Sequence, residues 1–549
     1  MSSTNNNNDD NNNNKCNHKN ISSKFCIEQR LALALENRRQ LSTLRSLELI
    51  SSSSSSSSSK VEQRPQQPQP QQPTPSIDFS SNDYLGLAHL KEQLHNVEKS
   101  YYHNFIKNNN PPYLGSTGSR LLSGNSNFIL HLEEKIARIH ASSSSSSSRR
   151  HHHHQQHRGH PSALLFNSGY DANLSLISSI PMKNDYILMD ELVHNSLIMG
   201  VKMSRMLDDH ILHFQHNNIN DLEEKLMLLS HLLDEQNIVF HNNSNSNSNN
   251  SSNENENDIQ NDDVLMTRGQ IIIIVESVYS MDGDIAPLED ILNLALVYNA
   301  KVIVDEAHGL GVFGKTNISD LYGGKDNKNK MMENEETDKQ KDDKSSLSND
   351  SSIIYGGTGV LAALDLEYHP SLLAAVYTFG KAAGCHGAVV ISKDIVKEYL
   401  INYARPFVYS TSLPPHSLCT IECAYDTMTN NQGEILRQKV FNLVRLFRTS
   451  IQNEFGRLSD DILFNSVSPI QSIMCRGNKR CVDVVNMLRK MGPFNLFPIR
   501  SPTVPKGEER IRVIIHAHNS EREVKHLVQC LCIILKERDC NKIHSLSKL

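Results

Sequence analysis

The chain has 549 residues, more than one average domain needs, and its formal net charge is -6, with Lys and Arg spread along the sequence. This distribution excludes a basic surface for nucleic acid or an anionic membrane, and no apolar stretch approaches the roughly 20 residues that cross a bilayer. The ten cysteines show neither CxxC pairs nor metal-ligand spacing, so we expect reduced thiols and no metal site.

Low-complexity sequence interrupts the chain at five places. Residues 1–25 are predicted to be a disordered tail and residues 51–75 a linker rich in Ser, Gln and Pro, because such polar segments cannot offset the entropy of ordering them. Residues 141–160, 241–263 and 325–352 are predicted to be inserts within a larger domain. The His run in the first insert is one homopolymer tract among several, so it is given no metal role.

The first regular elements are an N-terminal helix at 26–50 and an α/β domain at 76–415. Within that domain, short β-branched runs alternate with amphipathic helical patterns. Continuous apolar runs of this kind indicate a mainly parallel sheet that is covered on both faces. The expected strands are 163–166, 186–190, 271–275, 301–305, 374–378 and 388–392.

A smaller α+β domain is predicted at 416–546. Long helical patterns follow Pro415, and residues 469–475 and 510–515 are expected strands. A final helix is expected from about Ser520, and its apolar pattern fades after Leu535, leaving a polar tether to the end of the chain.

Unusual residues follow two of the expected strands, and a parallel sheet binds ligands at the carboxyl ends of its strands. Strand 301–304 is followed by Asp305 and, three residues later, His308; Lys381 comes soon after strand 374–377. An acid at a strand end often only caps a turn, and most lysines lie at the surface. The glycine-rich and apolar surroundings of Lys381 argue against an ordinary surface lysine.

Residues 168–170 lie between the first expected strand and a helix expected to begin near Asp171. The amides of a helix N-terminus suit an anion such as a phosphate group. A lysine for a Schiff base, an acid for a pyridinium nitrogen and a phosphate site are together the equipment of a pyridoxal 5'-phosphate (PLP) enzyme.

Six segments narrow this interpretation, because they resemble, in order, the motifs of the α-oxoamine synthase family of fold-type I PLP enzymes. The resemblance covers nearly all of the chain outside the low-complexity segments. It implies an α/β fold of type I, with a large domain built on a mainly parallel sheet and a smaller C-terminal α+β domain. The segments are FSSNDYLGL (79–87), GSTGSRLLSGN (115–125), FNSGYDAN (166–173), ESVYSMDGDIAPL (276–288), VDEAHGLGVFG (304–314) and TFGKAAGCHGA (378–388).

The resemblance implies roles for the residues around the cofactor ring. Lys381 is expected to bind PLP covalently and later to take the α-proton of the amino acid, while Asp305 keeps the pyridine nitrogen protonated. His194 is expected to stack on the ring and to act in catalysis and substrate binding. His308 and Ser280 are expected to contact the ring oxygen.

The same resemblance implies the phosphate and substrate contacts. Gly169, Tyr170 and Thr378 are expected to hold the cofactor around its phosphate. Arg500 resembles the arginine that binds the amino-acid carboxylate, a task suited to a planar fork of two donors, and Thr503 is expected to contact the substrate.

Within the family, several segments most resemble the members that condense L-alanine with pimeloyl-CoA or a pimeloyl carrier protein. That reaction yields 8-amino-7-oxononanoate and CO2 for biotin synthesis. Arg45, in the N-terminal helix, matches a substrate-contacting arginine of those members, although the ordinary alternative is a solvated helix face. The segments are ALENRRQLSTLRSL (34–47), SRLLSG (119–124), ARPFVYSTSLPP (404–415) and IRSPTVPKGEERIRV (499–513).

Two alternatives stay open. The first is another activity of the family, above all the glycine-using branch that forms 2-amino-3-ketobutyrate, which an assay of alanine against glycine separates. The second is an inert regulatory subunit, which would be expected to lack Lys381.

Two further expectations concern assembly and location. Fold-type I enzymes like this one share active-site residues across a homodimer interface, where Thr411 and Ser412 are expected to lie. The chain ends in Ser547, Lys548 and Leu549, a tripeptide read by the peroxisomal import receptor, so we expect a peroxisomal protein, with the cytosol as the alternative.

Overall fold

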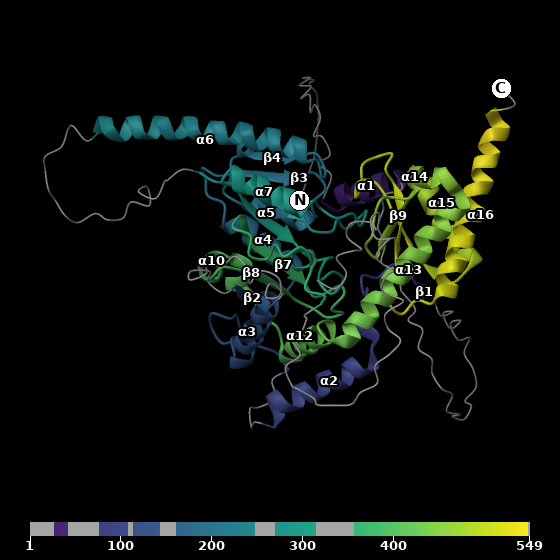
Figure 1. Ribbon diagram of the computed structural model, residues 1–549, viewed down its shortest axis with the longest axis horizontal. Coiled ribbons are helices and arrows are strands. Elements are labelled where there is room, and N and C mark those ends of the chain that lie inside the picture. Colours follow the sequence, from purple (N-terminus) through teal and green to yellow (C-terminus); the bar gives the residue numbers. More distant parts are fainter. Residues whose placement is uncertain are drawn as a thin grey trace, which may run out of the picture.

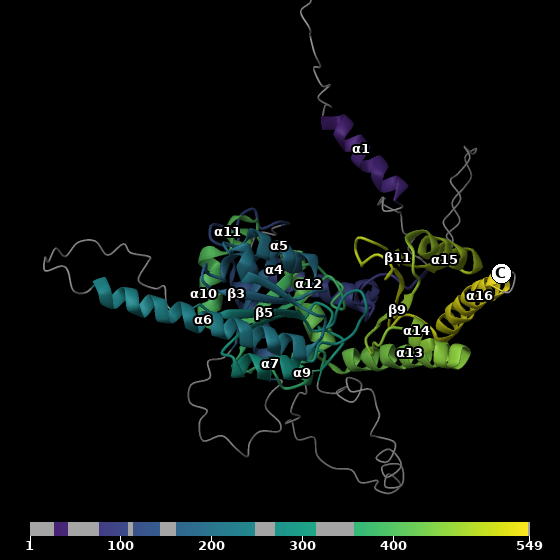
Figure 2. The same cartoon turned by 90° about the horizontal axis from the view of Figure 1, so that it is seen from above.

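The computed structural model describes residues 27–41, 76–107, 114–142, 161–247, 269–314 and 356–546. They form a large domain around a seven-stranded sheet and a smaller domain beside it (Figure 1). Helix α1 (Ile27–Gln40) lies within the expected N-terminal helix and stands away from both domains in Figure 2. The predicted tail, the linker and most of the three inserts lie outside the described residues.

The large sheet has the strand order β2-β8-β7-β6-β5-β3-β4. Five neighbouring strands run parallel, and only β8 runs antiparallel to its neighbours β7 and β2. The mainly parallel sheet of the prediction is therefore confirmed, and the six expected strands appear with ends within two residues of those predicted. The strands are β2 (Ser162–Phe166), β3 (Tyr186–Asp190), β4 (Ile211–Phe214), β5 (Ile271–Glu276), β6 (Lys301–Asp305), β7 (Leu372–Thr378) and β8 (Ala388–Ser392).

Helices cover both faces of this sheet. One face carries α3 (Asn127–Ser142), α6 (Ile219–Asn247), α7 (Leu288–Val297) and α12 (Pro415–Met428). The other carries α4 (Gly169–Ser179), α5 (Asn195–Met203), α10 (Asp394–Tyr403) and α11 (Arg405–Tyr409). The large domain also contains α2 (Lys91–Tyr101) and α9 (Val360–Ala363).

Alternate residues of each central strand enter different cores, which explains the continuous apolar runs. In β5, Ile273 packs into the cluster beneath α6 and α7, whereas Ile272 and Ile274 pack into the cluster beneath α4 and α5. Burying one such side chain contributes about 1.5–3 kcal/mol. The cores therefore fix the register of the strands whose ends carry the predicted site residues.

The smaller domain contains a three-stranded antiparallel sheet of order β11-β12-β9, packed against long helices. Its elements are α13 (Asn431–Phe455), α14 (Ser459–Ile462), β9 (Ile470–Met474), α15 (Asn478–Met491), β10 (Phe494–Asn495), β11 (Phe497–Ile499), β12 (Arg510–Ile514) and α16 (Glu521–Leu546).

The division between the domains differs from the sequence pattern in two places. Strand β1 (Ile77–Asp78) pairs with β10 of the smaller domain, although residue 76 was the predicted start of the large domain. Helix α12 packs on α2 and α3 of the large domain, so that domain extends past Pro415. Both differences arise from contacts between distant segments, which local patterns do not reveal.

Three local features also differ from the prediction. Strand β4 was not predicted, because it is a short and partly exposed edge strand. Helix α6 continues to Asn247, into the range assigned to an insert, and α16 continues to Leu546, through the expected tether. None of the described helices combines the length and apolar character of a membrane span, and no disulfide joins the seven cysteines whose side chains are described.

Candidate functional site

Three ionisable side chains lie within electrostatic range of one another at the carboxyl edge of the large sheet. Glu276 ends β5 and lies in register with Asp305, which ends β6. Lys381 follows the end of β7 by three residues. Burial lowers the pKa of Lys381 to about 8, although the nearby carboxylates of Asp305 and Glu276 act in the opposite direction. The structure therefore brings the predicted lysine and the predicted acid together.

A tight turn fixes the backbone around Lys381. The carbonyl oxygen of Lys381 accepts a hydrogen bond from the amide of Gly384 at 2.8 Å, and Cys385 N donates to Phe379 O at 3.0 Å. Gly384 has a φ of 62°, in the left-handed region, and a Cβ there would collide with the backbone at Ala88. Glycine at this position lets the turn pack against the 79–87 segment.

Asp305 is connected to His194 by a short chain of hydrogen bonds. The amide of Asn173 donates to Asp305 Oδ2 at 2.7 Å and to Ser196 Oγ at 2.9 Å. Ser196 Oγ lies 2.7 Å from His194 Nδ1, and Ala307 N donates to the other oxygen of Asp305. Asn173 and Ser196 were not predicted as site residues, although a buried Asn within FNSGYDAN was an available signal.

His194 caps the N-terminus of α5 and faces the same edge of the sheet. Burial lowers its pKa, and the positive charge of Lys381 lowers it further, while Asp305 has the opposite effect. The imidazole is therefore largely neutral near pH 7, which suits a flat ring stacked on a ligand.

His308 belongs to a buried network that reaches into the smaller domain. Its Nδ1 lies 2.5 Å from the hydroxyl of Tyr84, and Arg512 of β12 donates to Asn82 Oδ1 at 3.1 Å. Burial sets the pKa of His308 well below its usual value, and the charges of Lys381 and Arg512 lower it further. Both domains therefore contribute to the site.

The predicted phosphate contacts form a narrow cradle. Helix α4 begins at Gly169, two residues earlier than predicted, because Ser168 caps it by accepting from Asp171 N at 3.1 Å. A Cβ on Gly169 would lie only 2.8 Å from Thr378 Oγ1. Tyr170 is exposed beside them. The helix N-terminus and the Thr378 hydroxyl can thus bind one anion between them.

Two charged residues at this edge were missed. Glu276 is buried, its Oε1 has no hydrogen-bond partner within the described structure, and burial raises its pKa well above the usual value. Arg512 has an unpartnered Nε, and its charge acts on Lys381. Glu276 lies in the 276–288 segment and Arg512 in the 499–513 segment, both noted in the sequence. The sequence does not show that they are buried near each other, because they belong to different domains.

The other predicted site residues are placed as follows. Ser280 is half-buried in the turn after β5. Arg500 follows β11, its carbonyl accepts from Thr503 N at 2.9 Å, and its charge acts on Cys481 of α15. Arg45 lies outside the described residues, as do Ser547, Lys548 and Leu549. The predicted roles of all these residues stay predictions.

Thr411 and Ser412, expected at a subunit interface, contact the site motifs of their own chain. Thr411 O accepts from Asn167 Nδ2 at 2.8 Å, and Ser412 N donates to Gly118 O at 2.9 Å. The loop before α12 is therefore held beside the N-terminus of α4.

Asp78, His516 and His518 offer ligand atoms within 4.8 Å of one another, although no metal site was predicted. His516 Nε2 lies 2.9 Å from Ser81 O, and His516 Nδ1 lies 3.2 Å from Asn519 Oδ1. Because both ring nitrogens already face oxygen acceptors, this cluster is best explained as a link between the 79–87 segment and the smaller domain.

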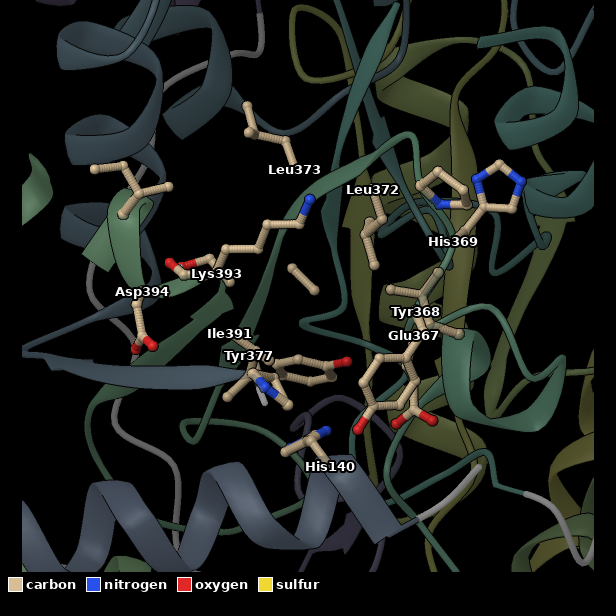
Figure 3. A pocket seen from close by; sticks show the side chains of 16 residues that line it. His140, Glu367, Tyr368, His369, Leu372, Leu373, Tyr377, Ile391, Lys393 and Asp394 are labelled. Atoms are coloured by element: carbon tan, nitrogen blue, oxygen red, sulfur yellow. The ribbon is translucent and has the colours of Figure 1, made fainter. Parts of the chain in front are cut away.

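A cavity of about 460 Å³ lies along β7, from its start to Tyr377 (Figure 3). Leu372 and Leu373 line it at the start of β7, and Lys393 lines it just after β8, with Tyr377 and His140 on its floor. It contains none of the predicted site residues, so the chemistry belongs to the carboxyl edge.

The carboxyl edge fits PLP on its own geometry. Lys381 supplies an amine, Asp305 an anchored carboxylate for a pyridine nitrogen, and the cradle at Gly169 a place for a phosphate. The orphaned buried oxygen of Glu276 and the unpartnered Nε of Arg512 are polar atoms that a bound ligand can satisfy.

Comparison with known proteins agrees with this geometry. Residues 74–249 and 247–531 match the aminotransferase class I and II family. A protein of Emericella nidulans named 8-amino-7-oxononanoate synthase is 31% identical over 527 residues, which cover 94% of this chain and 98% of that protein.

Solved structures share the fold. A serine palmitoyltransferase of Sphingomonas wittichii superposes with a TM-score of 0.58 at 21% identity, covering 83% of this chain and 86% of that one. An 8-amino-7-oxononanoate synthase of Francisella tularensis gives 0.54 at 20% identity, covering 84% and 98%. With a family match across both domains, the chain belongs to the aminotransferase class I and II family, as a PLP-dependent transferase of fold type I and of the α-oxoamine synthase type.

Proposed function

We propose that the protein condenses L-alanine with a pimeloyl thioester, with loss of CO2, to give 8-amino-7-oxononanoate in biotin biosynthesis. This proposal rests on one observation. Lys381, Asp305 and Glu276 lie close together at one edge of the sheet, beside the cradle at Gly169. The nearly full-length likeness to the Emericella nidulans protein supports this particular reaction.

PLP, when bound, supplies an electron sink for the α-carbon of the amino acid. Lys381 provides the amine that holds the cofactor and then moves the α-proton. A pKa of about 8 leaves about a tenth of such amines neutral at pH 7, so the group is a competent base near neutral pH. Asp305, fixed by Asn173, keeps a facing ring nitrogen protonated.

The carboxylate of the amino acid needs a cation, and two arginines are candidates. Arg500 matches the family motif, whereas Arg512 lies within electrostatic range of Lys381 and has an unpartnered Nε. We propose that Arg512 binds the carboxylate. Arg512→Gln should then raise KM for alanine more than Arg500→Gln does; the reverse order would assign the carboxylate to Arg500.

The direct test is an assay of the purified protein with PLP, pairing alanine, glycine or serine with pimeloyl-CoA or palmitoyl-CoA. The expected result is an amino ketone and CO2 from alanine and pimeloyl-CoA at a kcat/KM well above the other pairs. Preference for glycine would favour the 2-amino-3-ketobutyrate branch, and preference for serine with palmitoyl-CoA would favour the activity of the Sphingomonas neighbour. A pimeloyl carrier protein should be assayed as a second donor.

The proposal includes a homodimer and a peroxisomal location. The loop at Thr411 and Ser412 borders the cradle side of the site, where a second subunit is expected to complete it. Sedimentation of an active monomer at high dilution would contradict the dimer. The location rests on Ser547, Lys548 and Leu549 alone.

A further inference from the structure

The turn that follows β5, residues 278–285, is held from both domains. It is closed by an antiparallel bridge between its two ends, and it carries Ser280, the predicted contact to the cofactor ring. It also carries two aspartates, Asp282 and Asp284, that bind different partners. The position of Ser280 therefore depends on what binds these two carboxylates.

The smaller domain binds one side of this turn. Arg510 of β12 forms a buried ion pair with Asp282. Ser466 Oγ donates to Gly283 O at 2.7 Å, where a left-handed glycine lets the two domains approach closely. This side of the 278–285 turn is thus fixed to β12, the strand that also supplies Arg512.

His216, just after β4, binds the other side. Its Nδ1 lies 2.9 Å from Asp190 Oδ1, and its Nε2 lies 2.8 Å from Asp284 Oδ2. Because both nitrogens face carboxylates, both must carry a proton. Burial by itself lowers the pKa of His216, but the hydrogen bonds to Asp190 and Asp284 outweigh it and raise the pKa to about 10.

Asp190 connects this imidazolium to the loop that carries His194. It is fully buried at the end of β3, four residues before His194. Asp190 Oδ1 accepts from Leu192 N at 2.8 Å, and Asp190 Oδ2 accepts from Asn217 N at 2.9 Å. Asn217 Nδ2 donates to Asp284 Oδ2 at 2.6 Å, so Asn217 is a second connection, beside His216, between Asp190 and Asp284.

The bridge lies at the junction of the domains. A cavity of about 520 Å³ is lined by His216 and Asp284 from the large domain and by Phe464 and Arg510 from the smaller one. The ring of Tyr279 packs edge-on against His216, with centroids 4.3 Å apart and planes at 89°. Without the imidazolium, the two carboxylates would face each other with no positive charge between them.

We propose that His216 is a positioning residue for the cofactor site, because its charged bridge between Asp190 and Asp284 sets the position of the Ser280 turn relative to the His194 loop. This proposal rests on the proposed PLP site but not on the identity of the amino acid or the acyl group. His216 touches neither substrate nor cofactor in this arrangement; it acts through the two loops.

The test compares His216→Gln with His213→Gln, which replaces an exposed histidine three residues earlier on β4. Measurements are made on the full chain: the Kd of PLP for the apoprotein, the pH midpoint of the absorption band of the bound cofactor, and the Tm. His216→Gln should weaken PLP binding by about tenfold or more and shift the absorption midpoint. His213→Gln should leave both unchanged.

A second variant separates charge from folding. Asp284→Asn combined with His216→Gln removes one of the facing carboxylates and should recover part of the lost PLP affinity. If His216→Gln does not fold, Asp284→Asn alone should still weaken PLP binding relative to His213→Gln.

A lower Tm with unchanged PLP Kd and unchanged absorption midpoint would show a purely structural role and overturn the proposal. If alanine and pimeloyl-CoA give no product while these shifts occur, the proposed reaction fails and the positioning role stands.

Discussion

The environment at the edge of the sheet determines the pKa of the Lys381 amine. Burial favours its neutral amine, while the carboxylates of Asp305 and Glu276 favour the charged form, and burial prevails. An amine in this setting is reactive toward an aldehyde at neutral pH. Its surroundings come from the carboxyl ends of three adjacent parallel strands, β5, β6 and β7, which are separated in the chain by long connections.

The purified protein should be yellow, and borohydride should fix its cofactor onto Lys381. Peptide mapping by mass spectrometry would identify the modified lysine. Lys381→Ala should abolish the modification, whereas Lys393→Ala, at an exposed position after β8, should retain it. Recovery of the reduced cofactor on any other lysine would refute the assignment.

Gly169→Ala should weaken PLP binding by about tenfold, equivalent to about 1.4 kcal/mol. The reason is steric, because the added Cβ would lie 2.8 Å from Thr378 Oγ1. Gly115→Ala is the matched control, since a Cβ there meets no atom within 4 Å. PLP affinity of the apoprotein, measured by absorbance titration, checks both. Equal PLP affinities for the two variants would contradict the assignment of the phosphate site to this cradle.

The charged bridge at His216 should make stability depend on pH. The folded-state pKa of His216, about 10, lies above the ordinary histidine value of 6.5, so its contribution is complete below pH 6.5 and is lost as pH rises through about 10. The shift corresponds to at most about 5 kcal/mol. The groups around it that also titrate or carry charge are Asp190, Tyr279, Asp282, Asp284 and Arg510.

Chemical denaturation of the apoprotein at several pH values tests this. The difference in unfolding free energy between the unmodified chain and His216→Gln should shrink steadily from pH 6.5 to pH 10. A difference that stays constant over this range would mean that His216 is not protonated in the folded state.

At the scale of elements, strand β5 stabilises the sheet because all of its side chains are buried. Ile274→Ala should lower the unfolding free energy by about 2–5 kcal/mol, because the side chain is fully buried and its loss leaves a cavity. Ile395→Ala, on the exposed face of α10, should change it by less than about 0.5 kcal/mol. Urea unfolding curves measure both. Similar losses for the two would contradict the assigned core.

Local pattern predicted the elements that are regular and buried on both faces. Apolar runs and the residues that end or follow them predicted the six expected strands, Asp305 at the end of β6 and Lys381 in the turn after β7. Edge strand β4 was not predicted because it is short and only one of its four side chains, that of Phe214, is buried. The pairing of β1 with β10 and the approach of Arg512 to Lys381 join segments that are more than 100 residues apart, so periodicity alone gives no sign of them.

At the scale of the whole molecule, the proposed peroxisomal location rests on the final three residues. Removing Leu549 from a tagged protein should move it from peroxisomes to the cytosol, because the receptor reads a free terminal tripeptide. Activity of the purified variant should be unchanged, since the tripeptide lies beyond α16. Fluorescence microscopy with an N-terminal tag checks this. A full-length protein that is diffuse in the cytosol would contradict the proposed location.

The pairing of β1 with β10 has a consequence for synthesis on the ribosome. The partner strand emerges about 400 residues after β1, which takes about 20 to 80 s at ordinary rates of translation. During that interval the nascent large domain can begin to fold. Strand β1, however, has no native partner until β10 of the smaller domain has been synthesised. The 79–87 segment therefore acquires its final neighbours only near the end of translation, and with them the site gains Arg512.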